Sequence, residues 1–242
     1  MWGGSEFIRD SIKRVTDKPV FAPPPYAPRP EVADLGPVHF GLDPARMYLV
    51  TMFDAHSIHE RKNPTGAIEA FKRAFAPNEG PHLIVKAINV DRYVPGVQDH
   101  GRPDVAVINR YMPVPEKNAL LNLSRTLVSL HRSEGFGLPL LEAMWLERGT
   151  IATNYSGNLD FMNQETSWLM PYRRVPIVES SGFYPRDQEW AEPDIDAAAV
   201  AIRESVLDQS LYDIKVSAAK KLVSTLHERR IDFVRQRLSE IT

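Results

Sequence analysis

Apolar residues in the middle of the chain follow two alternating patterns. Short, nearly continuous apolar runs predict buried strands, and they lie at 47–53, 82–88, 105–108, 126–130 and 150–153. Apolar residues at helical spacing predict helices between these strands, at 64–75, 117–123 and 138–146. Strands that alternate with helices are typical of a doubly wound parallel sheet. We therefore predict an α/β, Rossmann-like fold.

The two ends of the chain have other patterns. Residues 5–15 predict one amphipathic helix that begins with Ser5 as its N-cap. Eight prolines lie between Pro19 and Pro44, and so many prolines exclude a central strand or a helix interior there. From Asp194 onward the pattern predicts two helices and no strand, with the second helix, broken or continuous, at 211–238.

Composition narrows the function classes. The 242 residues, 43% of them hydrophobic, suit one large α/β domain or two small ones. A formal charge of −2 gives no affinity for nucleic acid. The sequence has neither an apolar run of about eighteen residues nor a signal peptide, so we expect a cytoplasmic protein without a transmembrane segment. The absence of cysteine excludes thiolate nucleophiles and sulfur-ligated zinc.

The loop after the strand at 126–130 is the first candidate site, because ligands of open parallel sheets bind outside the carboxyl ends of the strands. Gly135 and Gly137 in this loop permit close approach of the backbone to a ligand. The free N–H groups and the dipole of the following helix N-terminus favour an anion such as a diphosphate. Glu134 and Glu142 flank the loop, and each carboxylate can accept hydrogen bonds from sugar hydroxyls.

Three further residues near the strand ends have two interpretations each. Lys86 interrupts the apolar strand at 82–88, near its carboxyl end. Its side chain either reaches the cleft or lies at the sheet edge with its charge in solvent. His131 and Arg132 end the strand that enters the loop, so either could face a ligand. A histidine at such a position is more often structural, with its hydrogen bonds satisfied inside the protein.

Two pairs of residues resemble metal sites, but we predict no metal. His56 and His59 have a suitable spacing, yet no third ligand is evident nearby. Asp194 and Asp196 form an Asp-x-Asp pattern, but they follow Pro193 and open a helix, where helix capping explains them better.

The segment from His131 to Glu142 reads HRSEGFGLPLLE. It resembles the Glu-x7-Glu motif of the retaining GT-B glycosyltransferases of family 4, also called group 1. Segments 53–57 and 60–64 resemble the first strand and phosphate-binding loop of this family's donor domain. Segments 151–161, Tyr184 and 190–194 resemble a mannosyltransferase-like subgroup that often builds bacterial surface polysaccharides. The resemblance covers nearly the whole chain and implies the C-terminal half of a GT-B fold with a C-terminal helical tail. Tyr184 and Trp190 would serve either as packing anchors or as stacking partners for the base.

The resemblance also implies a division of the chain. Residues 1–18 would be a remnant of the acceptor domain's last helix, and 19–45 a proline-rich interdomain linker. Residues 46–210 would form the nucleotide-sugar-binding Rossmann-like domain, and 211–242 a C-terminal helix that packs back toward the N-terminal side. The N-terminal GT-B domain, which binds the acceptor, would be missing from this sequence.

Residue roles follow from the same resemblance. Glu134 is expected to contact the transferred sugar and Glu142 the ribose. The backbone of the glycine loop is expected to contact the sugar and diphosphate, through Gly135, Phe136, Gly137 and Leu138. Basic residues after the first strand of the domain bind the phosphates in this family, which points to Arg61 and Lys62. The family form separates this Arg and Lys by several residues, whereas here they are adjacent and Ser57 falls near the expected Arg.

We therefore take Glu134, Arg61 and Lys62 as candidate catalytic residues, and add Lys86 and His131 to the donor-binding residues. The implied reaction transfers a hexose from a nucleoside diphosphate sugar, GDP- or UDP-hexose, to a glycan or lipid-linked acceptor with retention and without a cofactor. Glu134 would orient the sugar, or alternatively form a covalent glycosyl intermediate. The protein would be cytoplasmic, in part peripheral to the inner face of the membrane.

Two other functions stay open at this point. The chain could be a nucleotide-sugar-binding module that is inactive alone because the acceptor domain is missing. It could also be a GT-B sugar-nucleotide epimerase or hydrolase, which would need an acid/base pair near the sugar carbon that the sequence does not reveal.

Overall fold

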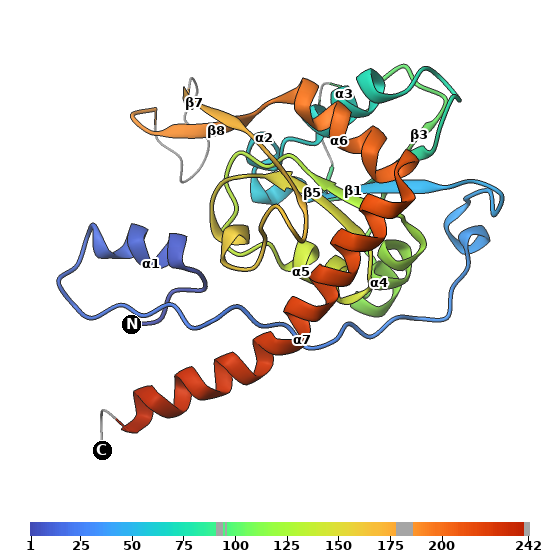
Figure 1. The fold of residues 1–242 in the computed structure, drawn as a ribbon. Coiled ribbons are helices and arrows are strands. Elements are labelled where there is room, and N and C mark those ends of the chain that lie inside the picture. The colour runs from blue at the N-terminus through green and yellow to red at the C-terminus, as the bar shows by residue number, and fades with distance from the viewer. Residues whose placement is uncertain (91–93, 95, 178–185, 240–242) are drawn as a thin grey trace.

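A six-stranded parallel sheet forms the centre of the computed structural model, which describes residues 1–90, 94, 96–177 and 186–239 (Figure 1). The strands follow the order β3-β2-β1-β4-β5-β6 across the sheet. Their bounds are β1 Tyr48–Asp54, β2 His82–Ile88, β3 Val105–Asn109, β4 Thr126–Ser129, β5 Gly149–Thr153 and β6 Trp168–Met170. The predicted doubly wound α/β fold is confirmed.

Helices cover both faces of this sheet. The helices α3 (Pro64–Ala74) and α6 (Ile195–Leu207) pack on one face, where their apolar side chains share a core cluster with Leu49, Leu83 and Ile151. The other face is covered by α4 (Val114–Leu123), α5 (Leu138–Trp145) and α7 (Gln209–Ser239). The predicted helices are confirmed, although α4 begins at Val114, three residues before the predicted start.

The order of the strands reverses between β1 and β4. The chain runs outward from β1 through β2 to β3, returns to the middle, and then runs outward again from β4 to β6. Connections therefore leave the carboxyl ends of β1 and β4 in opposite directions, which opens a crevice between their loops. The fold thus places the loop 55–63 beside the loop 130–137.

Two features of the sheet region were not predicted. The strand β6 has only three residues, too few to give a periodic pattern. The strands β7 (Tyr172–Pro176) and β8 (Glu189–Pro193) form an antiparallel hairpin, and the predominantly polar, exposed sequence of β7 hides it from hydrophobic analysis. Tyr184 lies outside the described residues, whereas Trp190 on β8 is 9% exposed and packs near the Arg132 guanidinium.

The predicted caps and terminal helices take the expected form. Asp194 caps α6, because its carboxylate accepts hydrogen bonds from the N–H groups of Asp196 and Ala197 at 2.9 and 3.0 Å, and the capping interpretation is confirmed. Ser5 caps α1 (Glu6–Lys13) through a hydrogen bond from the Ile8 N–H. The final helix α7 is continuous.

The two ends of the chain lie side by side. The helix α7 runs across the sheet domain, and its C-terminal end extends toward the N-terminal segment (Figure 1). The rings of Trp2 and Phe233 lie 6.0 Å apart, and Arg230 donates a hydrogen bond to the Pro24 carbonyl at 3.3 Å. Within 19–44 the backbone forms only the 3-10 turn η1 (Pro37–Phe40) and an isolated bridge from Phe21 to Trp2.

The glycine loop after β4 is held by the turn η3 (Gly157–Asp160), which follows β5. The Gly157 N–H donates to the Glu134 carbonyl at 2.9 Å. A Cβ atom on Gly157 would lie 2.1 Å from the Gly135 carbonyl oxygen, a distance that no folded backbone tolerates. Glycine at 157 is therefore required for the two loops to pack.

We expect Gly157→Ala to lower the free energy of unfolding by about 2 kcal/mol or more, because one of the two loops must move. Urea unfolding of the purified chain measures the change. Gly36→Ala is the matched control, because a Cβ there meets no atom within 4 Å, and it should change stability by less than about 0.5 kcal/mol. Equal stabilities of the two variants would contradict the packing argument.

Candidate functional site

The loop after β1 has an unusual backbone that aims its basic residues at the crevice. It comprises the 3-10 turn η2 (Ala55–Ser57) and the short helix α2 (His59–Lys62). Ile58 between them has φ of 63°, which is strained for a β-branched residue, and Asn63 after them has φ of 50°. These two left-handed positions turn the chain sharply on each side of α2.

Asn63 joins the loops after β1 and β4. Its side chain is buried, and its Nδ2 donates to the Leu130 carbonyl at 2.9 Å. Its Oδ1 accepts from the Gly66 N–H at 3.1 Å and so caps α3. A single amide side chain therefore fixes both the start of α3 and the distance between the two loops.

The predicted residues Arg61, Lys62 and Glu134 meet across this junction. Lys62 Nζ donates a hydrogen bond to Glu134 Oε2, and Arg61 lies 3.8 Å from the same oxygen. Arg61 also donates to the Ser133 carbonyl at 2.7 Å. Burial raises the pKa of the Glu134 carboxyl group, but the charge and hydrogen bond of Lys62, with a smaller contribution from Arg61, lower it below its ordinary value. Glu134 is therefore an ionised carboxylate at neutral pH.

The glycine loop presents free backbone donors. Gly137 has φ of 91° and precedes α5, which has no side-chain cap at its N-terminus. Among the described residues, no acceptor takes a hydrogen bond from the N–H groups of Gly135, Phe136, Gly137 or Leu138. Meanwhile the Gly135 carbonyl accepts from Ser5 Oγ at 2.6 Å. The Gly135 carbonyl thus has a hydrogen-bond partner, whereas the N–H groups of the loop are available.

Glu142 lies in α5 and is 6% exposed. Its Oε2 accepts a hydrogen bond from Lys117 Nζ of α4, within an ion pair. Sequence analysis missed Lys117, although its position near the start of the helix that follows β3 indicates this edge of the sheet. Each of the two motif carboxylates therefore has its own lysine.

Lys86 is buried at the end of β2, with 5% of its surface exposed. Its Nζ donates to the carbonyls of Ala87 at 2.8 Å and Arg110 at 2.7 Å. Burial, with a smaller contribution from the nearby charge of Arg110, lowers the pKa of Lys86 to about 8 against the opposing charges of Glu116 and Asp54. Of the two interpretations, the structure supports the one in which Lys86 reaches the cleft.

A pocket of about 250 Å³ opens at this edge of the sheet. The ends of β1 and β2, the loop after β3 and the helices α2, α4 and α5 form its walls. Its lining residues are Met52, Phe53, Asp54, Ser57, Lys62, Lys86, Ile88, Tyr111, Met112, Lys117 and Pro139. Three lysines from three different elements thus converge on one cavity.

His131 and Arg132 have structural partners instead. His131 is fully buried, with Nδ1 3.1 Å from Ser129 Oγ and Nε2 3.1 Å from both the Tyr155 carbonyl and Asn158 Oδ1. Burial lowers the pKa of His131, so the ring is neutral, and two acceptors around Nε2 place the proton there. Arg132 donates to Glu192 and to the Glu60 carbonyl. The geometry favours the structural interpretation of His131 and gives no support to a donor contact.

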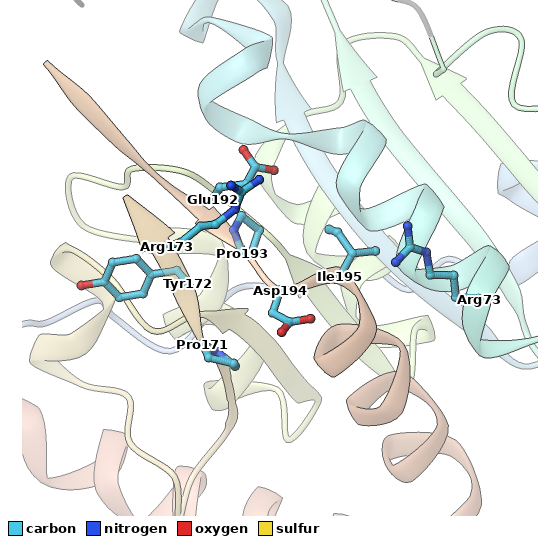
Figure 2. A pocket seen from close by; sticks show the side chains of 8 residues that line it. All are labelled: Arg73, Pro171, Tyr172, Arg173, Glu192, Pro193, Asp194 and Ile195. Atoms are coloured by element: carbon cyan, nitrogen blue, oxygen red, sulfur yellow. The ribbon is translucent and has the colours of Figure 1, made fainter. Parts of the chain in front are cut away.

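A larger pocket of about 430 Å³ lies elsewhere, between the hairpin β7–β8, α3 and the start of α6 (Figure 2). None of the predicted site residues lines it. Its Glu192 is paired with Arg132, its Arg73 with Asp196 at 2.7 Å, and its Asp194 caps α6. We take the smaller pocket as the candidate site, because it combines a strand switch point with converging cations.

Comparison with known proteins identifies the family of the chain. Residues 51–172 match the sequence model of the family described as Glycosyl transferases group 1, a match over half of the chain. The chain belongs to the group 1 glycosyl transferases. The matched segment of this group 1 chain begins within β1 and contains both loops of the crevice. No curated protein matches the sequence.

Solved structures of GT-B glycosyltransferases share the fold of this group 1 chain. Anabaena Alr3699/HepE in complex with UDP and glucose has a TM-score of 0.69 at 12% identity, covering 98% of this chain and 62% of that one. Sucrose-phosphate synthase from Thermosynechococcus elongatus has a TM-score of 0.68 at 15% identity, covering 100% and 58%. The pneumococcal O-GlcNAc transferase GtfA in complex with UDP and GlcNAc has a TM-score of 0.63 at 16% identity, covering 96% and 42%.

These similarities establish the Rossmann-like half of a GT-B fold. The chain spans between 42% and 62% of the length of these three structures. No helix in the described part of the chain is both long and apolar enough to cross a membrane. Among the same residues, no group of three histidine, aspartate or glutamate side chains is arranged to hold a metal ion.

The low pKa of Lys86 gives a test of its environment. Because its pKa falls from 10.5 to about 8 on folding, the unfolded chain holds more protons between these two pH values. The contribution of Lys86 to the free energy of unfolding should therefore rise with pH in that window, by up to about 1.4 kcal/mol per pH unit.

Urea unfolding gives the free energies of unfolding of wild type and Lys86→Met from pH 7 to 10. The slope of the difference between the two free energies against pH measures this contribution. The slope is informative even though the variant also leaves the carbonyls of Ala87 and Arg110 without a donor, because that loss is a constant offset. The reference variant is Lys72→Met, because Lys72 lies on α3, outside the pocket. A difference that stays constant from pH 7 to 10 would show that Lys86 is not desolvated.

Proposed function

We propose that this chain is the donor-binding half of a retaining hexosyltransferase of family 4, and that the crevice between the loops after β1 and β4 binds a nucleoside diphosphate sugar. The observation that carries the proposal is the pairing of each motif carboxylate with a lysine, Glu134 with Lys62 and Glu142 with Lys117, on either side of a loop with free N–H groups. Such an arrangement offers fixed cations for a diphosphate and fixed acceptors for two sets of sugar hydroxyls.

Charge supports a diphosphate as the central group. Arg61, Lys62, Lys86 and Lys117 outnumber the carboxylates Glu134, Glu142 and Asp54, so the site has a net positive charge. The unpaired N–H groups of residues 135–138 and the dipole of α5 add to it. An anion that binds here would exchange its hydrating water molecules for protein hydrogen-bond donors that are already in position.

The sugar and the ribose then lie on opposite sides of the diphosphate. In the proposed complex, Glu134 accepts hydrogen bonds from the transferred hexose and Glu142 from the ribose. Arg61, Lys62 and the glycine-loop N–H groups hold the diphosphate, whose negative charge grows as it leaves. Stabilisation of such developing charge usually contributes more to catalysis than any other single effect.

Glu134 orients the sugar in this proposal and does not attack it. Its carboxylate is held by Lys62 and lies 3.8 Å from Arg61, and its pKa is lowered, so its charge is already compensated. A carboxylate stabilised in this way is a weak nucleophile. The incoming acceptor hydroxyl would instead attack from the face that the diphosphate leaves, which retains the anomeric configuration.

The acceptor would contact another domain. Because the chain spans about half the length of the GT-B structures that it resembles, we propose that acceptor binding and part of catalysis require a further domain. The acceptor class that fits the family resemblance is a glycan or lipid-linked glycan of a surface polysaccharide, with a mannosyltransferase-like activity. In that case this chain alone binds donor without transferring it.

A titration with nucleotide sugars tests donor binding. We expect one of UDP-, GDP-, ADP- or dTDP-hexose, at about a hundred times its Kd, to stabilise the chain by about 2.7 kcal/mol, which corresponds to a Tm increase of about 5 °C or more. Glu142→Ala and the isosteric Glu142→Gln should abolish the shift. Glu69→Ala on α3 removes an exposed glutamate and should keep it. If no nucleotide sugar stabilises the chain, the donor-site proposal fails.

Transfer by the protein together with its acceptor domain tests catalysis. Lys62→Met removes a fixed cation beside the developing diphosphate charge, so kcat should fall about 100-fold. The anomeric configuration of the product, read by NMR, should equal that of the donor. Lys72→Met is the matched control and should leave kcat unchanged. An inverted product, or equal rates for the two variants, would contradict the assigned mechanism.

A further inference from the structure

The ammonium group of Lys86 has one hydrogen left for a ligand. An ammonium carries three hydrogens and no acceptor. Two of the three are directed to the carbonyls of Ala87 and Arg110, at 2.8 and 2.7 Å. In the part of the chain that the structure describes, no further acceptor contacts this Nζ. Because Lys86 lines the pocket, its remaining hydrogen is available there.

Lys86 lies on a different strand from the residues that we propose to contact the sugar and the phosphates. Glu134 follows β4, Lys62 follows β1, and Lys86 lies on β2, so the three follow the strand order β4-β1-β2. A nucleoside diphosphate sugar that has its hexose at Glu134 and its phosphates at Lys62 extends its nucleoside toward β2. This step rests on the donor site proposed above.

The walls around Lys86 suit a flat ring. Met52, Ile88 and Met112 are apolar, and Tyr111 adds an aromatic side chain from the loop after β3. Aromatic and apolar walls bind the faces of a nucleobase without distinguishing one base from another. Base identity is then decided by the polar atoms at the edge of the ring, which is where a buried donor acts.

We propose that Lys86 reads the nucleobase of the donor, and that it selects a base with a carbonyl group at pyrimidine C4 or purine C6 over a base with an amino group there. A carbonyl oxygen accepts the remaining hydrogen of the ammonium group. An amino group is itself a donor, so it leaves that hydrogen without a partner in a buried site, and an unmatched buried donor is strongly disfavoured. The donor nucleotide is therefore of the uracil, thymine or guanine type.

Matched nucleotide pairs test the inference by isothermal titration calorimetry at pH 7. UDP and CDP differ in this carbonyl or amino group, and IDP and ADP differ in the corresponding group of a purine. In the pair whose ring size fits the pocket, we expect the carbonyl nucleotide to bind about tenfold or more tightly. Lys86→Met should reduce this preference to about twofold or less, whereas Lys72→Met should preserve it.

Each other outcome overturns a defined part of the proposal. Equal affinities within both pairs for wild type, with clear binding, would refute base selection and leave the donor site intact. A loss of affinity in Lys86→Met that is equal for both members of a pair would assign Lys86 to the ribose or phosphates and refute the inference. If none of the four nucleotides binds, the proposed function itself fails. Even if Lys86→Met does not fold, equal affinities in the wild type would refute base selection.

Discussion

The hydrogen bond from the Asn63 side chain to the Leu130 carbonyl is the interaction on which the site depends. It spans the point where the strand order reverses, and it is buried, so it is not weakened by competition with water. It joins the loop that carries Arg61 and Lys62 to the loop that carries Glu134, together with the hydrogen bonds of Arg61 to the Ser133 carbonyl and of Arg132 to the Glu60 carbonyl. The unusual φ of Asn63 follows from this role, because the same residue must end α2, cap α3 and reach the neighbouring strand.

The site is built from pairs of opposite charge that are largely removed from solvent. A buried carboxylate or lysine alone would be destabilising, and pairing makes both tolerable. The pairs also fix the side chains before any ligand arrives, which reduces the entropy lost on binding. Lys86 differs from Lys62 and Lys117, because backbone carbonyls and not a carboxylate hold it, and burial without an ion-pair partner keeps its pKa low.

Sequence analysis succeeded where burial produces a long, regular pattern. Strands β1 and β2 are almost wholly buried and helix α3 has a continuous buried face, so their apolar residues define them clearly. It failed for β6, which is too short, and for the hairpin β7–β8, because most of β7 is exposed and polar and so gives no apolar pattern. The motif located Glu134 and Glu142, but Lys117, the partner of Glu142, comes from another helix, and no local pattern encodes that pairing. The roles of the site residues stay predictions until ligand binding is measured.

The contact between α1 and the glycine loop links two parts of the chain that are far apart in sequence. Ser5 Oγ bonds the Gly135 carbonyl, and the Glu6 N–H donates to Asp160 in the turn that supports the same loop. The Gly135 carbonyl and the Phe136 N–H belong to the same peptide unit. An anion that accepts a hydrogen bond from this N–H polarises the unit and so strengthens the hydrogen bond from Ser5 to the carbonyl. By thermodynamic reciprocity, anything that displaces α1 must loosen the anion, and a tightly held anion must resist the displacement of α1. The first helix of the chain is thus energetically coupled to whatever occupies the crevice.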